Sequence, residues 1–186
     1  MSTPAPGVPD FTAGYGPQQS DFQSWWVNAA AFFQQRVIFR ALQSTTATTI
    51  PDTGNPTTIG FDDVLEDPYS GWDDVHYTWT PPAGYSGWYM VTLQVIMVAA
   101  PSASSITLST YVEQNGGVTL FPLASTVLAG GSGAATCGNG GAQYVYLTGG
   151  QDIVAAKAAI QNAAADLDTS VTAGQQSAME IVWISG

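Results

Sequence analysis

Most of the chain alternates apolar and polar residues with a period of two, which is the pattern of half-buried β-strands. In the segment RVIFRAL (36–42), Val37, Phe39 and Ala41 fall on one face and the residues between them on the other. Turn-forming stretches such as PDTGNP and PPAGYSG separate these segments. Short strands at this spacing predict an all-β sandwich or jelly roll. The predicted strands are 36–42, 57–61, 76–80, 88–99, 104–117, 118–126, 142–150, 152–160 and 177–185.

One of these strands has an alternative. Residues 155–165 are rich in alanine, which has the highest helix propensity of the amino acids. A helix over 155–165 therefore stays open beside the strand predicted at 152–160.

Near the start of the chain the apolar period changes to 3.6, which is typical of one face of an α-helix. Ser20 followed by Gln23 fits a capping box, and Asp21 is favourable at a helix N-terminus. The pattern therefore predicts a short amphipathic helix over residues 20–35. Its apolar stripe carries five aromatic side chains: Phe22, Trp25, Trp26, Phe32 and Phe33.

This helix is not expected to be stable alone. Burial of its rings would contribute roughly 8 to 15 kcal/mol, and ordering about fifteen residues costs as much or more. The aromatic residues are therefore assembly or anchoring candidates, which need a covering surface on the chain's own domain or on another chain. The preceding residues 1–19 hold four prolines and three glycines, which favours an extended arm.

The charge balance excludes several classes of partner. Charged residues make up 9% of the 186 residues, the net charge is -11, and the basic residues are Arg36, Arg40 and Lys157. Phosphate binding needs a cluster of Lys and Arg, so we expect neither a nucleic-acid partner nor binding to an anionic membrane surface. The longest apolar run, VTLQVIMVAA (91–100), is too short to span a bilayer, so no membrane insertion is expected.

The first residues and the cysteine content indicate the folding compartment. Residues 1–20 lack the basic and apolar regions of a signal peptide. Cys137 stands alone, which excludes an internal disulfide. The chain is therefore expected to fold in a cytoplasm.

Several motifs resemble the C1q/TNF-like family and occur in the family's order. VIFRA opens the domain, and TTIGFDDVLEDPYSGWDDVHYTWTPPAGYSGWYMVTLQV follows, with Gly87 and Tyr89 where the family has Gly-x-Tyr. YVEQNGG, VYLTGGQDIVAAKA and EIVWISG resemble its later strands, although an extra Gly-Gln separates Gly149 from Asp152. The resemblance implies a C1q/TNF-like jelly-roll β-sandwich of ten strands over residues 36–186, forming a compact homotrimer.

PDFTAGYGPQQSDFQSW (9–25) and VLEDPYSGWD (64–73) are also similar to structural proteins encoded in the virion modules of actinobacterial phages. The resemblance implies a virion protein that is assembled in the host cytoplasm and exposed on the particle exterior. Residues 1–35 would anchor an outward-displayed trimer to other virion proteins. A minor tail protein is the first expectation. A head decoration protein that binds the major capsid protein and stabilises the shell is the alternative.

A carbohydrate- or receptor-binding module, similar to a lectin, is a further alternative, with a host cell-surface glycan as its partner. Aromatic rings outside the helix could stack on sugars, or could lie in the core or the trimer interface. These residues are Trp72, Tyr77, Trp79, Tyr85, Trp88 and Tyr89.

An acidic segment, FDDVLEDPYSGWDD (61–74), is the one candidate metal site. Oxygen-rich loops can hold Ca²⁺, and the candidate ligands are Asp62, Asp63, Glu66 and Asp67. Their spacing is not that of an EF-hand, so the default expectation is that these carboxylates are solvated or pair with Arg36 and Arg40. No other cofactor is expected.

No pattern in the sequence predicts catalysis. GGSGAATCGNGG (130–141) lacks the Lys-Ser/Thr of a phosphate loop and is expected to be a flexible apical loop. Cys137 within it and His76 are a lone cysteine and a lone histidine with nothing to fix their approach. We therefore expect that the protein is not an enzyme.

Overall fold

The computed structural model describes residues 38–98, 105–117, 119–129 and 136–185. The predicted arm (1–19), the predicted helix (20–35) and Arg36 lie outside these residues, so those predictions stay predictions. Every described strand pairing is antiparallel. The predicted all-β class is confirmed.

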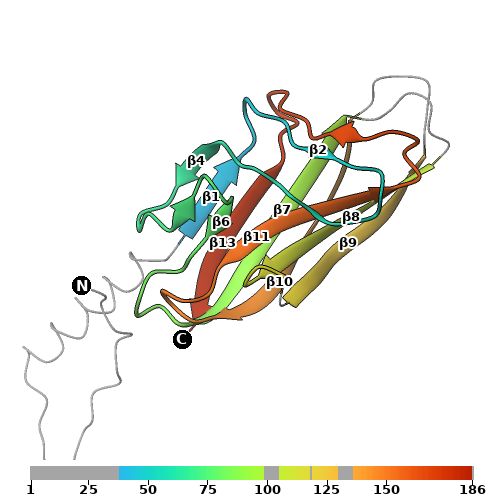
Figure 1. The fold of residues 1–186 in the computed structure, drawn as a ribbon. Helices are drawn as coiled ribbons and strands as arrows, with labels where there is room; N and C mark the ends of the chain where they lie inside the picture. The colour runs from blue at the N-terminus through green and yellow to red at the C-terminus, as the bar shows by residue number, and fades with distance from the viewer. Residues whose placement is uncertain (1–37, 99–104, 118, 130–135, 186) are drawn as a thin grey trace, which may run out of the picture.

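Two sheets pack face to face. One has the strand order β10 (Thr136–Leu147), β7 (Gly87–Val98), β13 (Ala178–Ser185), β1 (Ile38–Leu42) and β4 (Asp63–Glu66). In the other, the order is β5 (Trp72–Asp73), β6 (Thr78–Trp79), β11 (Val154–Gln161), β8 (Ser105–Gln114) and β9 (Thr119–Ala129). β3 (Thr57–Thr58) also pairs with β11, and β2 (Thr49–Ile50) pairs with β12 (Leu167–Asp168). Figure 1 shows β7 and β13 side by side, with β1 and β4 beyond them.

The long strand β7 shows how the sequence pattern builds the core. Buried positions alternate with partly or fully exposed ones along the whole strand. Tyr89, Val91 and Leu93 are buried, whereas Trp88 and Gln94 face outward. The strand predicted at 88–99 is confirmed, because one face of β7 supplies the core between the two sheets.

The alanine-rich segment is a strand, and the helix left open over 155–165 is wrong. β11 lies inside its sheet, with β8 on one side and β3 and β6 on the other. Ala156 and Ala158 contribute to the core, and Ala155 and Ala159, which point the other way, are also buried. Tertiary burial of both faces has overridden the helix propensity of alanine.

The sequence suggested that the whole glycine-rich segment 130–141 is a loop. That expectation is wrong for its second half, because β10 begins at Thr136. Gly138, Gly140 and Gly141 each pair with a residue of β7. A Cβ atom on Gly140 would lie 2.6 Å from the carbonyl oxygen of Leu93. Glycine is needed there because the two backbones approach closely; it does not mark a turn.

The predicted Asn-Gly turn is confirmed. Asn115 and Gly116, which follow β8, have φ angles of 55° and 66°, as tight hairpin turns require. The side chain of Asn115 donates a hydrogen bond of 2.7 Å to Asp152, and the same carboxylate accepts 2.7 Å from the backbone N–H of Thr148. Asp152, part of the motif that resembles the C1q/TNF-like family, therefore holds this turn against the segment between β10 and β11.

The single lysine forms a mostly buried ion pair on the outer side of the second sheet. The Lys157 Nζ atom lies 2.9 Å from Oε2 of Glu113, and their side chains are 19% and 11% exposed. A charge so sheltered needs its partner, so Lys157 is unavailable for binding an anionic ligand.

Candidate functional site

The outer surface of β7 and β10 carries large apolar side chains that the described protein leaves uncovered. Tyr146 lies opposite Trp88, and Tyr144 opposite Met90. Trp88, Tyr144 and Tyr146 are 49%, 59% and 52% exposed, and the rings of Trp88 and Tyr146 meet edge to face with centroids 5.7 Å apart. Val182 of β13 pairs with Met90 and extends the surface. We call these five residues the aromatic face.

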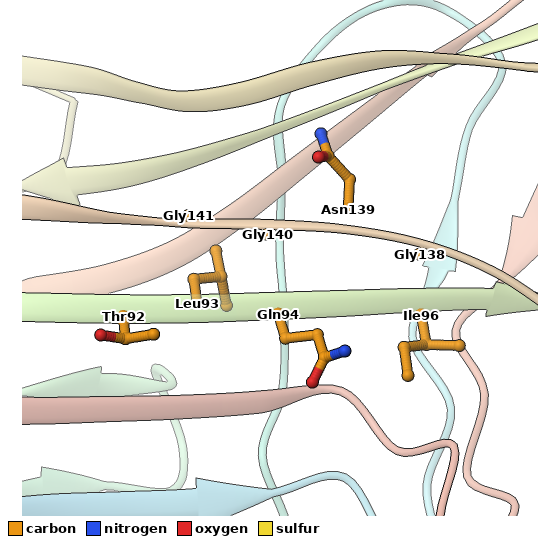
Figure 2. A pocket seen from close by; sticks show the side chains of 8 residues that line it. All are labelled: Thr92, Leu93, Gln94, Ile96, Gly138, Asn139, Gly140 and Gly141. Carbon is orange, nitrogen blue, oxygen red and sulfur yellow. The ribbon is translucent and has the colours of Figure 1, made fainter.

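Further along the same two strands the side chains become small or polar. Gly138, Gly140 and Ala142 of β10 stand beside Ile96, Gln94 and Thr92 of β7. The missing side chains leave a shallow cavity of about 580 Å³. In Figure 2 the side chains of Thr92, Gln94 and Ile96 lie on the side of the sheet opposite Asn139. A second polypeptide could approach the backbone closely here.

Arg40 has a different ionic partner from the one expected. It lies between Glu180 of β13 and Glu66 of β4 in strand register, and its Nε atom is 3.9 Å from Oε1 of Glu180. Both side chains of this ion pair are about half exposed, so the pair contributes at most about 1 kcal/mol. The ionic partner expected for Arg40 was a carboxylate of the acidic segment 61–74. The observed partner is Glu180, because the pairing of β1 with β13 brings it beside Arg40.

Asp62, one of the candidate calcium ligands, anchors a loop. Its carboxylate accepts hydrogen bonds from the backbone N–H groups of Ser44, Thr45 and Thr46 at 2.6 to 2.9 Å, and from the hydroxyl of Thr45. Desolvation raises the pKa of Asp62, but the hydrogen bonds together outweigh it and hold that pKa far below its usual value. Both oxygens are therefore engaged by the chain itself.

Replacing Asp62 with alanine is expected to lower stability in a pH-dependent way. Because the folded-state pKa is depressed, the unfolded chain binds more protons as the pH falls below about 4. The stabilisation is thus fully present above that pH and is lost as the pH falls toward the folded-state pKa. Urea unfolding should show a deficit of about 1 kcal/mol at pH 7, shrinking at pH 3. A deficit that is equal at both pH values would contradict the role of the charge.

The other acidic residues of the segment are dispersed. Asp63 and Glu66 begin and end β4. Asp67 accepts hydrogen bonds from the Trp72 backbone N–H at 2.9 Å and the Trp79 indole N–H at 3.4 Å. Within the described residues no three His, Cys, Asp or Glu side chains lie close enough to hold a metal ion. The calcium site remains a prediction without a preformed ligand cluster.

The aromatic residues singled out from the sequence separate into two groups. Trp79, Tyr85 and Tyr89 are buried in the core, which was one of the two expectations. Trp72 and Tyr77 lie at a cavity beside β4 and β5 and are partly exposed, and Trp88 belongs to the aromatic face. Sequence reasoning missed Tyr144 and Tyr146, although the alternation in AQYVYL places both on one side of a strand.

Burial raises the pKa of Tyr69 to about 12, with a smaller contribution from its hydroxyl contact with Tyr85 at 3.3 Å. Burial also raises the pKa of Tyr89, whose hydroxyl donates to the carbonyl oxygen of Tyr85. Both phenols are therefore neutral at physiological pH, and both contact Tyr85.

The candidate nucleophile and base lie in different parts of the sandwich. Cys137 belongs to β10, opposite Met97. His76 follows β5 and places Nδ1 2.7 Å from Oδ2 of Asp73, with its side chain 74% exposed. Hydrogen bonds from His76 and Val75 hold the pKa of Asp73 below its usual value. The contact between His76 and Asp73 stabilises the turn before Tyr77. His76 therefore has a structural role that does not involve Cys137.

The fold resembles that of TNF-type jelly-roll proteins. The Eiger TNF of S. frugiperda superposes with a TM-score of 0.54 at 12% identity, covering 81% of this chain and 93% of that one. A crystal structure of murine APRIL at pH 8.0 gives 0.53 at 17% identity, covering 81% and 100%. The chain has a TNF-like jelly-roll fold. No family model and no curated protein matches the sequence.

No helix in the described ranges is both long and apolar enough to cross a bilayer.

Proposed function

We propose that the chain is a structural protein of a bacteriophage particle, in which three copies assemble through the aromatic face and display the jelly roll outward. The observation that carries the assembly is the uncovered group of Trp88, Tyr144 and Tyr146. Monomeric proteins rarely leave large apolar side chains gathered on one surface, because burying them is favourable. A second copy of the same chain is the partner that is always available.

The flanking cavity supports contact between copies. Gly138, Gly140 and Ala142 let a neighbouring chain approach the strand backbone, while the rings beside them supply apolar area. Most homo-oligomers close with cyclic symmetry. The threefold order is taken from the resemblance of the sequence motifs to the C1q/TNF-like family.

Charge supports the placement on the particle exterior. A net charge of -11 with three basic residues disfavours contact with packaged DNA. Of those basic residues, Arg40 and Lys157 already pair with Glu180 and Glu113. The rings at 22–33 would attach the trimer to a neighbouring virion protein.

A minor tail protein is the first form of this proposal, and a head decoration protein is the second, since both need an anchor and an outward trimer. Immunogold labelling of particles that contain this chain distinguishes them. Gold at the tail supports the first form and gold at the head the second. Particles without label would overturn the virion role.

Replacing both Trp25 and Trp26 with alanine tests the anchor. We expect the purified protein to remain assembled through the aromatic face, while its amount in purified particles falls by about tenfold or more, because buried tryptophans dominate interfaces. Quantitative immunoblotting of gradient-purified particles measures this. The matched control replaces Gln34 and Gln35 with alanine and should be incorporated normally. Normal incorporation of the tryptophan variant would refute anchoring by this segment.

A further inference from the structure

The two sheets leave a cavity at one side of the sandwich, away from the aromatic face. β4 is the last strand of the first sheet, at the opposite edge from β10, and β5 is the last strand of the second. The cavity between them has a volume of about 580 Å³. It is lined by Phe61, Asp62, Val64, Trp72, Asp74 and Tyr77.

Aromatic rings form one wall of this cavity, and each packs against a neighbouring part of the fold. Trp72 stacks on the buried ring of Phe39 with centroids 4.9 Å apart and planes at 23°. The ring of Tyr77 lies 6.5 Å from that of Trp72. It rests on Gly60, where a Cβ atom would come within 2.9 Å of it. The Tyr77 ring can occupy this position because Gly60 has no side chain.

Tyr77 is held in an unfavourable backbone conformation. Its φ angle is 56°, which is rare and strained for an aromatic residue. The preceding turn is fixed by Asp73, whose Oδ1 atom accepts hydrogen bonds of 2.9 Å and 3.1 Å from the N–H groups of Val75 and His76. In this conformation Tyr77 lies at the cavity and is 37% exposed.

The carboxylates of the cavity differ in their availability. Asp62 is engaged by the loop at residues 44–46. Asp74 is exposed, and in the described part of the chain its carboxylate has no hydrogen-bond or ionic partner. It is an acceptor for a ligand's hydroxyl groups.

We propose that this cavity binds an uncharged pyranose sugar, with its C–H face on Tyr77 and Trp72 and a hydroxyl donating to Asp74. An anionic sugar is disfavoured because carboxylates line the cavity and Arg40 and Lys157 pair elsewhere. A quaternary ammonium needs rings on several sides, but Phe61 is buried and the exposed rings form one wall. This site goes beyond the proposed assembly and does not depend on it.

The test is saturation-transfer NMR on the full-length protein. Its probes are the methyl pyranosides of α-D-glucose, α-D-mannose and β-D-galactose, with N-acetylneuraminic acid and choline chloride as charged comparators. We expect at least one neutral pyranoside to bind, and neither comparator. Binding of none of the three pyranosides would overturn the proposal, as would binding of a comparator in their place.

The variants separate the ring from the fold. Tyr77→Gly removes the ring and relieves the positive φ, so the protein stays folded, and affinity should fall by about tenfold. Asp74→Asn should weaken binding by about fivefold, whereas replacing both Gln34 and Gln35 with alanine should leave it unchanged. Undiminished binding by Tyr77→Gly would overturn the proposal. So would binding that appears only when Trp25 and Trp26 are both replaced by alanine, because the chain's own segment would then fill the cavity.

Discussion

Replacing Trp88 with glutamate is expected to convert the proposed trimer into monomers. Trp88 is 49% exposed and meets Tyr146 edge to face within the aromatic face. In a complex both rings would be buried, and a charge there would be buried without a partner, which opposes association by several kcal/mol. Sedimentation equilibrium should give three times the monomer mass for the natural protein and the monomer mass for Trp88→Glu.

The matched control is Val75→Glu. Val75 is 75% exposed but lies in the turn after β5, away from the aromatic face, so this variant should stay assembled. Tyr144→Glu, on the aromatic face, should behave like Trp88→Glu. All three should keep the far-ultraviolet circular dichroism of the natural protein, since exposed sites tolerate charge. A natural protein that sediments as a monomer would refute the proposed assembly outright.

Replacing Trp79 with alanine should lower the free energy of unfolding more than the other substitutions named above. Trp79 is fully buried, with its ring 6.0 Å from that of Phe39 and 5.8 Å from that of Tyr89. Its indole N–H also donates to Asp67. Removing so large a side chain leaves a cavity between the sheets and orphans that acceptor, so the free energy of unfolding should fall by about 3–5 kcal/mol.

Guanidinium unfolding measures this loss. The natural protein and the variant are compared at a concentration where each sediments as a single species of the same oligomeric state, because association would otherwise add to the free energy of unfolding. Val75→Ala serves as the comparison and should change the free energy of unfolding by less than about 0.5 kcal/mol. A loss below about 1 kcal/mol for Trp79→Ala would contradict the role of this ring in packing the two sheets against each other.

Strand alternation made the fold largely predictable. In β7 and β13 the inward residues are apolar and the outward ones mixed, so the period is visible without knowledge of the partner strands. β5 and β12 are two residues long. They went unpredicted because so short a pairing leaves no period to detect.

The candidate sites were less predictable. The aromatic residues at 72–89 were recognised, and a place in the core was one of their expected roles, but the sequence did not say which of them would lie there. Trp79 and Trp88 lie in the same kind of sequence, yet one is in the core and the other on the surface. The cavity beside β4 is lined by residues from the edges of both sheets. Gly60 and Tyr77 come into contact because the chain between them folds back, which no local sequence pattern shows.

The sequence by itself determined the class of fold, the strands of the core and the scarcity of positive charge, because these depend on local periodicity and composition. Tertiary structure decided between the strand and the helix that the alanine-rich segment left open, and it alone decided that Arg40 pairs with Glu180 and which rings remain exposed. The physical reason is that burial and ion pairing depend on neighbours distant in the chain, and a residue's own side chain does not specify which neighbours it will have.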